Sequence, residues 1–355
     1  MYKILVINPG STSTKLAVYE GENEVFNDTI RHSSKELSKY NNIIEQLDFR
    51  VDCILNTLQG NNFLLSEFDA VVGRGGLLKP VESGTYIVND IMINDLKNGV
   101  QGEHASNLGG IIARLIADKY GIPAFIVDPV VVDELEDVAR ITGIPEIKRK
   151  SRFHALNQKA VARRLSKDIG KEYEKANLII AHLGGGISVG AHKKGRIVDV
   201  NDAINGDGPF SLERAGGLPA IDVANLCFSG KYGYEEIKKM INGKGGMTAL
   251  LGTNDVREVL KRINNGDKYA KLVFEAMAYR VAKEIGSMAA VLKGHVDAIG
   301  ITGGIAYSEE FVTLIKDRVN FIAPIYVYPG EEEMLALAQG ALRVLNGEEK
   351  AKEYV

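Results

Sequence analysis

A short motif occurs twice in this chain: an apolar strand, a turn rich in small residues, and a second strand. The first copy is Lys3 to Tyr19 (KILVINPGSTSTKLAVY). The second is Leu178 to His192 (LIIAHLGGGISVGAH), followed by a third strand at Arg196 to Val200. The copies begin about half a chain apart. This repeat predicts two related α/β halves in a chain of 355 residues, each long enough for its own core.

Strand and helix patterns alternate through the rest of the chain, which indicates α/β architecture. In the longest helical pattern, Asp267 to Lys293, apolar residues recur at three- and four-residue steps, as in a helix that packs on a core. The other expected strands are Ala70 to Val72, Thr85 to Val88, Ala124 to Val127, Val296 to Thr302 and Ile325 to Tyr328. The other expected helices are Ala105 to Tyr120, Ala155 to Ala176, Ser308 to Asn320 and Glu332 to Leu345.

Charge and composition exclude several classes of protein. With 43 Lys and Arg against 46 Asp and Glu, the net charge is −3, which argues against binding to nucleic acid through its phosphates. No apolar stretch approaches the roughly 20 residues that span a bilayer, and no signal peptide is visible. Cys53 and Cys227 cannot form a disulfide framework. We therefore expect a cytoplasmic protein without membrane partners.

Three glycine-rich turns account for part of the high glycine content, 38 residues. They are Asn8 to Lys15, Gly184 to Ser188 and Gly303-Gly304, and each follows an apolar strand. Turns without side chains let backbone N–H groups converge on an anion. One such turn usually only reverses the chain. Two similar hairpins and a third turn that opens a helix favour a clamp for nucleotide phosphates, although Walker A and GxGxxG patterns are absent.

The same segments resemble a known family. NPGSTSTK (Asn8 to Lys15), AHLGGGIS (Ala181 to Ser188) and ITGGIAYSEEF (Ile301 to Phe311) are similar to the phosphate and adenosine loops of the acetate and butyrate kinases. GRGGLLKPVESGTY (Gly73 to Tyr86) resembles the butyrate kinase branch. The resemblance implies the two-domain actin-like ATPase fold of sugar kinases and Hsp70 chaperones, with duplicated ribonuclease H-like domains. We expect one domain at residues 1–150 plus 331–355 and the other at 151–330, with ATP in the cleft between them.

The resemblance also implies roles for single residues. The expected catalytic residues are Arg74, Asp128, His154, His182 and Arg214. The expected substrate-binding residues are Arg74, Gly76, His104 and Phe153. The expected ATP-binding residues are Asn8, Ser11, Thr12, Lys15, His182, Gly184, Gly185, Gly186, Asp255, Val256, Arg257, Gly303, Gly304 and Ile305. Mg²⁺ is assigned to Asn8, Glu332 and Glu333, although the two glutamates also suit a helix N-terminus. Gln158 departs from the family, where acetate kinases carry a second histidine.

The implied reaction is reversible transfer of the ATP γ-phosphoryl group to the carboxylate of butyrate. That carboxylate is ionised at neutral pH, so the reaction needs no general base but does need positive charge and in-line positioning. Gly75 and Gly76 stand where acetate kinases have valines, which predicts room for a four-carbon acid. An acetate, propionate or branched-chain acid kinase is an alternative, and a nucleotide-dependent binding module is one from another class. The resemblance suggests a homo-oligomer, at least a dimer.

Overall fold

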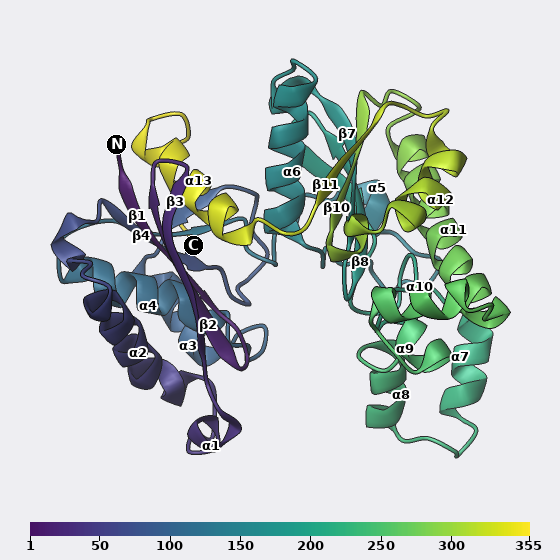
Figure 1. Cartoon of the computed structure of the whole chain (residues 1–355), viewed down its shortest axis with the longest axis horizontal. Helices are drawn as coiled ribbons and strands as arrows, with labels where there is room; N and C mark the ends of the chain where they lie inside the picture. Colours follow the sequence, from purple (N-terminus) through teal and green to yellow (C-terminus); the bar gives the residue numbers. More distant parts are fainter. The chain divides into compact units, whose positions relative to one another are not determined.

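The computed structural model describes all 355 residues. The chain divides into two compact units, Met1–Asp133 with Glu332–Val355, and Glu134–Glu331. In each unit one sheet carries helices on both of its faces (Figure 1). This is the α/β architecture that the alternating strand and helix patterns predict.

The first unit holds a six-stranded sheet in the order β3-β2-β1-β4-β6-β5. Its α4 packs on β4, β6 and β1, and α13 packs on the same three strands from the other face (Figure 1). The strands are β1 (Lys3–Pro9), β2 (Ser13–Glu20), β3 (Asn23–Arg31), β4 (Ala70–Arg74), β5 (Thr85–Ile87) and β6 (Ala124–Val127). The helices are α1 (Ser34–Leu37), α2 (Leu47–Gly60), α3 (Asp90–Asn98), α4 (Asn107–Asp118) and α13 (Glu333–Leu345).

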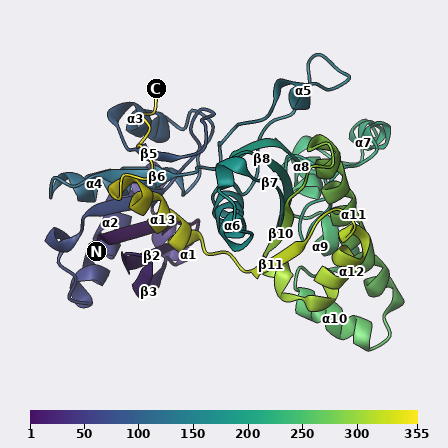
Figure 2. The same ribbon diagram turned by 90° about the horizontal axis from the view of Figure 1, so that it is seen from above.

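The second unit holds a five-stranded sheet in the order β11-β10-β7-β8-β9. Its α6 packs on β7 and β10, while α11 packs on β8, β7 and β9 from the opposite face (Figure 2). The strands are β7 (Asn177–Leu183), β8 (Ile187–Lys193), β9 (Arg196–Val200), β10 (Ala298–Gly303) and β11 (Ile325–Pro329). The helices are α5 (Asp137–Arg140), α6 (Ala155–Asp168), α7 (Ala220–Cys227), α8 (Tyr234–Ile241), α9 (Gly246–Leu251), α10 (Val256–Asn264), α11 (Lys268–Val291) and α12 (Glu309–Val319).

The two sheets share one topology, which confirms the internal repeat. In the first unit β1 pairs antiparallel with β2 and parallel with β4, and β4 pairs parallel with β6. In the second unit β7 pairs antiparallel with β8 and parallel with β10, and β10 pairs parallel with β11. The third strands, β3 and β9, each add antiparallel to the second. The duplicated hairpin therefore begins two sheets of equivalent strand order.

The first unit boundary falls between Asp133 and Glu134, whereas the expected one lay near residue 150. The segment in between is held on the second unit by charged contacts. Glu134 Oε2 lies 2.6 Å from the Nζ of buried Lys159, and Arg149 Nη1 lies 2.8 Å from Asp199 Oδ1. These ion pairs join the two ends of the segment to α6 and to β9 of the second unit.

The C-terminal tail returns to the first unit, beside α3 and β5 (Figure 2). Lys352 bridges Tyr86 on β5. Tyr354 is 2% exposed, and its hydroxyl donates to Asp95 Oδ2 over 2.7 Å. The tail is therefore part of the packed structure of the first unit.

Candidate active site

The turn between β1 and β2 presents polar groups to solvent. Ser11 and Thr12 are exposed, and so is Lys15, which pairs with Asn8 across the β1–β2 ladder. The Gly10 N–H donates a hydrogen bond of 2.7 Å to the Ser13 carbonyl oxygen, which closes the turn. Hydroxyls, an amine and open backbone are groups that bind phosphate. That this turn binds phosphate stays a prediction.

Arg50 of α2 is fully buried beneath this turn. Its guanidinium donates to the carbonyls of Ser11 and Ser13, at 3.3 and 3.1 Å, to Thr14 Oγ1 at 3.0 Å, and to Gln46 Oε1. All of these acceptors are uncharged. Burial lowers the pKa of Arg50, but a guanidinium stays protonated at neutral pH. An unneutralised cation therefore lies directly below the exposed turn and favours an anion there. The sequence analysis missed Arg50, because it did not predict α2.

Arg74 ends β4, the parallel neighbour of β1, so its side chain emerges at the same sheet edge as Asn8. Arg74 Nη1 lies 2.6 Å from Glu333 Oε2, and Asn8 Nδ2 donates to the same oxygen over 3.1 Å. Glu333 is the first residue of α13, and Glu332 is its N-cap. The structure therefore brings together Asn8, Arg74 and Glu333, which are distant in sequence.

Close packing explains the glycines around Arg74. A Cβ at Gly73 would lie 2.0 Å from the Gly109 carbonyl oxygen of α4, and one at Gly75 would lie 2.5 Å from Pro129 Cβ. A Cβ at Gly76 would lie 2.6 Å from Asn107 Cα. The space that we expected for a four-carbon acid beside Gly75 and Gly76 is therefore filled by protein. That steric argument is wrong, because these glycines let α4 and the loop after β6 approach the backbone.

His104 lies before α4 and remains solvent-accessible. Its Nδ1 is 2.8 Å from Ser106 Oγ, which orients the ring. Partial desolvation of the ring, with the positive charge of Arg74 second, lowers the pKa of His104. The neutral ring is consequently favoured near this cationic edge.

Asp128 follows β6 directly, and its neighbour Val127 pairs with Arg74 in the sheet. The backbone of Asp128 has φ of 38°, which is rare for a residue other than glycine. Its Oδ1 accepts hydrogen bonds from Ser83 Oγ at 2.5 Å and from the Gly84 N–H at 2.8 Å. These bonds fix the carboxylate at the same edge as the other residues of the first unit.

His154 and His182 are stacked in the second unit, with ring centroids 3.8 Å apart and planes at 16°. His182 Nδ1 lies 2.8 Å from Asn157 Oδ1, and His154 Nδ1 lies 2.9 Å from Ser188 Oγ. His182 is 1% exposed and its Nε2 has no hydrogen-bond partner. A buried polar atom of this kind is one that a polar group of a ligand would satisfy.

Glu331 is an acidic neighbour of this pair that the sequence analysis missed. Its Oε1 lies 3.0 Å from His182 Nε2, within ion-pair distance but without hydrogen-bond geometry. The run Glu331-Glu332-Glu333 in the sequence could have indicated Glu331, but we assigned roles only to Glu332 and Glu333.

The glycine loop after β7 accommodates Arg214. A Cβ at Gly186 would lie 1.7 Å from Arg214 Nη1, so the guanidinium rests directly on the bare backbone. Ser211 Oγ donates to the Gly185 carbonyl oxygen over 2.6 Å, and Arg214 Nη1 donates to the Ala203 carbonyl oxygen. Burial lowers the pKa of Arg214, which still stays charged. The glycine loop and Arg214 are therefore packed directly against each other.

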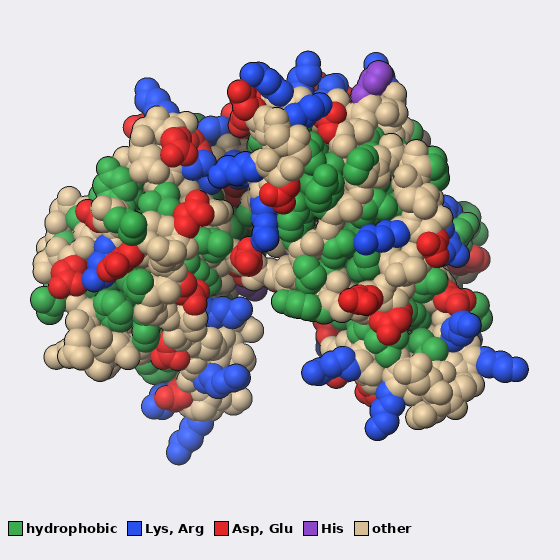
Figure 3. Space-filling model, turned by 45° about the horizontal axis from the view of Figure 1, so that its top comes forward, with side chains coloured by type: hydrophobic (Ala, Val, Ile, Leu, Met, Phe, Trp, Pro, Cys, Tyr) green, Lys and Arg blue, Asp and Glu red, His purple; other side chains and the backbone are tan.

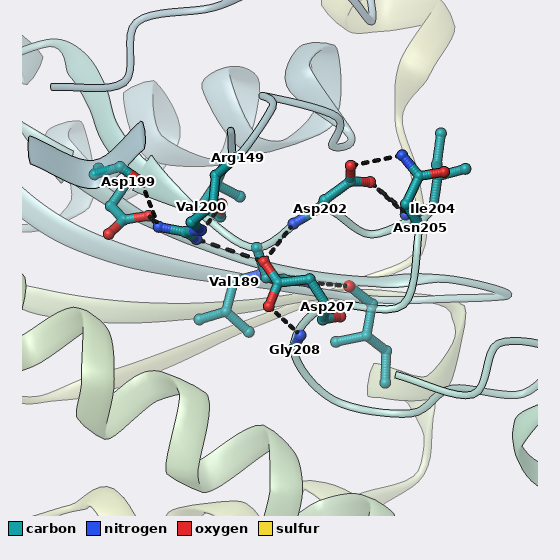
Figure 4. Close-up of polar contacts among 12 residues, drawn as sticks. Arg149, Val189, Asp199, Val200, Asp202, Ile204, Asn205, Asp207 and Gly208 are labelled. Atoms are coloured by element: carbon teal, nitrogen blue, oxygen red, sulfur yellow. Dashed lines mark hydrogen bonds and ion pairs between the residues drawn. The ribbon is translucent and has the colours of Figure 1, made fainter. Parts of the chain in front are cut away.

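Acidic side chains shape the segment that presents the Ala203 carbonyl (Figure 4). Asp202 Oδ1 accepts from the backbone N–H groups of Ile204 and Asn205, at 3.0 and 3.1 Å. Asp207 accepts from the Asp202 N–H at 3.1 Å and lies 3.5 Å from Arg149 Nη2. These bonds hold the loop that in turn positions Arg214.

Comparison with known proteins identifies the family. The sequence model of the acetokinase family matches residues 92–345. The chain belongs to the acetokinase family. It is 61% identical to butyrate kinase 2 of Clostridium acetobutylicum and 60% identical to a probable butyrate kinase of Clostridium botulinum, in both cases over 353 residues and 99% of each chain. The crystal structure of Porphyromonas gingivalis acetate kinase shares its fold, with a TM-score of 0.82 at 20% identity over 97% of this chain and all of the other. The expected actin-like two-domain fold is therefore confirmed.

As an acetokinase, the chain uses ATP and ADP as cosubstrates. The residues expected at adenosine lie at two helix starts of the second unit. Asp255 is the N-cap of α10 and pairs with the exposed Arg257 over 2.8 Å, while Val256 is half-buried. Gly303 ends β10 with φ of 93°, and a Cβ there would lie 2.3 Å from the Leu183 carbonyl oxygen. Gly304 is exposed and Ile305 is buried.

Phe153 and the molecular surface complete the description of this acetokinase. Phe153, expected at the substrate, is 3% exposed and precedes α6. Acidic and basic side chains are interspersed over the face drawn in Figure 3, as the net charge of −3 leads one to expect. No helix has both the length and the hydrophobicity needed to cross a bilayer.

Proposed function

We propose that this chain is a butyrate kinase, which transfers the γ-phosphoryl group of ATP reversibly to the carboxylate of butyrate. The observation that carries the proposal is the identity of about 60% over nearly the whole chain to the butyrate kinases of two Clostridium species. The GRGGLLKPVESGTY segment around Arg74 supports the same branch of the family.

The side chains fit the charge requirements of this reaction. An ionised carboxylate must approach an anionic phosphoryl group, so positive charge and alignment replace a general base. In the first unit, Arg74 would bind the carboxylate and the buried Arg50 would add positive potential under the Ser11–Thr12 turn. In the second unit, Arg214 would bind the equatorial phosphoryl oxygens. His154 would donate a hydrogen bond to the group in transfer. His182 would do so from Nε2 only with hydrogens on both ring nitrogens, because its Nδ1 hydrogen faces Asn157 Oδ1.

The glycine loops would hold the nucleotide. Gly185, Gly186 and Gly304 carry no Cβ, so their backbone N–H groups would suit phosphate and ribose oxygens. The N–H groups of Gly184 and Gly303 donate to the carbonyl oxygens of Gly186 and Gly330 and shape these loops. Asp255, Val256 and Arg257 would lie at the adenine, and His104 and Phe153 at the acyl chain. Asp128 would orient an arginine or a metal-bound water.

We also propose Mg²⁺ as the metal. The chain has no group of three or more His, Cys, Asp or Glu side chains that would hold a metal by protein ligands alone. Mg²⁺ does not need one, because it binds through one or two carboxylates together with substrate phosphates and water. Glu333 and Asn8, already in contact, fit this ligand set, with Glu332 beside them. When bound, Mg²⁺ would offset charge on the β- and γ-phosphate oxygens.

The substrate is tested by trapping acyl phosphate with hydroxylamine, using acetate, propionate, butyrate, isobutyrate and valerate. We expect the highest kcat/KM with butyrate. A preference for acetate or for a branched acid would assign the chain to another acid kinase. ATP turnover that no short-chain acid changes would instead favour a nucleotide-dependent binding module.

We further propose that the chain forms at least a dimer. Helix α7 buries none of its residues, and its Ile221 is 73% exposed. Phe228, which follows α7, is 91% exposed. A second copy would cover these apolar side chains. Sedimentation velocity of the wild type and of Phe228→Glu tests this, and a monomeric wild type would refute it.

A further inference from the structure

A chain of buried hydrogen bonds crosses the second unit and ends on His154. Tyr173 OH is 2.8 Å from His192 Nδ1, and His192 Nε2 is 3.1 Å from Gln158 Oε1. Gln158 Nε2 is 2.9 Å from Ser188 Oγ, which is 2.9 Å from His154 Nδ1. His192, Gln158 and Ser188 are completely buried, and Tyr173 is 5% exposed. The roles proposed above use only the last ring of this chain.

The direction of these bonds follows from one backbone carbonyl. Gln158 Nε2 also lies 3.1 Å from the Ser188 carbonyl oxygen, which can only accept. The amide therefore presents its NH₂ group to Ser188 and its Oε1 to His192. Consequently His192 carries a hydrogen on Nε2. Burial holds the pKa of His192 well below its usual value, so the ring is neutral and its bare Nδ1 accepts from Tyr173.

The orientation of the Gln158 amide also determines how the Ser188 hydroxyl bonds to His154. Gln158 Nε2 and His154 Nδ1 are the two partners of Ser188 Oγ. Because Gln158 is a donor, the hydroxyl hydrogen has His154 Nδ1 as its acceptor. A hydrogen on that nitrogen would face the hydroxyl hydrogen and leave it buried without an acceptor, which is strongly unfavourable.

The backbone of β8 makes room for this arrangement. A Cβ at Gly190 would lie 2.5 Å from Gln158 Oε1 and 3.6 Å from His192 Nε2. Glycine inside a strand often marks a close approach of this kind. The Gln158–His192 contact is therefore built into the sheet.

We infer that Tyr173, His192, Gln158 and Ser188 are positioning residues that hold His154 in the tautomer with its hydrogen on Nε2. His154 then presents one donor, at Nε2, and no competing tautomer. The tautomer of His154 follows from the hydrogen bonds themselves. Its consequence for catalysis rests on the proposed function, in which His154 donates to the transferring phosphoryl group. The glutamine that departs from the family at position 158 thus has a specific task, because its two ends are a fixed donor and a fixed acceptor.

The tautomer is measured by long-range ¹H–¹⁵N correlation NMR on the full chain labelled at its six histidines. His154→Gln identifies the His154 signals. We expect the wild type to show His154 and His192 with hydrogen on Nε2. Ser188→Ala should give a mixture of tautomers at His154, and Ser188→Thr, which keeps the hydroxyl, should restore one form. A wild-type His154 with its hydrogen on Nδ1 overturns the inference, and so does a Ser188→Ala spectrum identical to that of the wild type.

Gln158→Leu removes the fixed donor and the fixed acceptor from the chain. The Ser188 hydroxyl can then either donate to His154 Nδ1 or accept from it, so both tautomers of His154 should appear. Ser166→Ala is the matched control, since Ser166 is also a buried serine of the second unit but its hydroxyl has no partner. This control should leave the His154 signals unchanged.

Kinetics then separate positioning from stability. We expect Ser188→Ala and Gln158→Leu to lower kcat by about tenfold, with KM for ATP and butyrate nearly unchanged, because the donor acts on the transition state. If the wild type shows the expected tautomers but its ATP turnover does not depend on a short-chain acid, the proposed function is refuted and this inference stands. If ATP turnover depends on butyrate but His154 carries its hydrogen on Nδ1, this inference is refuted and the proposed function stands.

Discussion

Glu333 Oε2 lies 2.6 Å from Arg74 Nη1 and accepts from Asn8 Nδ2 over 3.1 Å. One carboxylate oxygen therefore connects a residue that we assign to the substrate with a residue that we assign to the metal. Because the guanidinium is occupied by this carboxylate, substrate carboxylate and Glu333 would compete for Arg74 unless a cation binds Glu333. Metal binding and substrate binding should consequently support each other.

We expect Glu333→Gln to lower kcat by about a hundredfold and to raise the Mg²⁺ concentration needed for half-maximal rate. Stability should change by less than about 1 kcal/mol, since the ion pair is partly exposed. Steady-state rates over a Mg²⁺ titration measure this. Glu349→Gln is the control, because Glu349 forms an ion pair of similar length with Arg343 in the same unit. Equal losses in both variants would contradict a metal role for Glu333.

Gly186→Ala should displace Arg214, because the new methyl would lie 1.7 Å from Nη1. The flexible arginine can move aside, so we expect the unfolding temperature to stay close to that of the wild type while kcat falls by about a hundredfold. Gly185→Ala is the comparison, since its Cβ would meet no atom closer than 3.8 Å. If Gly185→Ala lowers kcat as much as Gly186→Ala does, the loss comes from the change in the glycine loop and not from displacement of Arg214.

Gly76→Val should destabilise the first unit by about 3 kcal/mol instead of changing the preference for acid length, because its side chain would collide with Asn107 and Leu96. Thermal unfolding and the ratio of kcat/KM for butyrate and acetate measure the two effects. Gly143→Ala, at a glycine with open space around it, should be nearly neutral. A stable Gly76→Val variant that prefers shorter acids would instead support the expectation that Gly76 provides space for the acyl chain.

Arg50→Gln should raise the KM for ATP by about tenfold and weaken its dependence on salt, because the buried charge under the Ser11–Thr12 turn is lost. Arg50→Lys keeps the charge but cannot reach all four acceptors, so we expect an intermediate KM. Initial rates over a range of ATP and NaCl concentrations measure this. Lower stability with an unchanged KM in both variants would mean that Arg50 only supports the loop.

Stability should depend on pH through Glu284 of α11. Burial, with the negative charge of Asp207 second, raises the pKa of Glu284 from 4.5 to about 7. The native state then binds more protons than the unfolded state between these values, so this contribution is present below pH 4.5 and is lost as pH rises through 7. Glu284→Gln should be more stable than the wild type at pH 8 by roughly 3 kcal/mol, and nearly equal to it at pH 4. Urea unfolding at both values measures this, and an equal gain at both would reject the titration.

The sequence predicted the parts of the fold that have strong local patterns. The strands at Ala124–Val127 and Arg196–Val200 have the expected bounds, and the apolar stripe of α11 packs in the core. It did not predict α2, α3, or the helices α7 to α10, where short helices alternate with glycine turns or lack buried residues, nor the mostly exposed β3.

The structure brings together those expected site residues that lie at a strand end. Residues whose position depends on tertiary packing were not predicted. Asn8 and Arg74 lie at the ends of buried strands and Asp128 directly follows one, so sheet order alone brings them to one edge. Nothing local marks Arg50, whose role comes from the turn above it. Gly76 was misread because a missing side chain means either open space or close contact, and only the position of α4 distinguishes the two.

The shared strand order makes the β1–β2 and β7–β8 turns equivalent positions in two sheets. The first turn offers serine and threonine hydroxyls above the buried Arg50, and the second offers bare backbone on which Arg214 rests. If both turns bind phosphate as we propose, the first would use side-chain donors and the second main-chain donors.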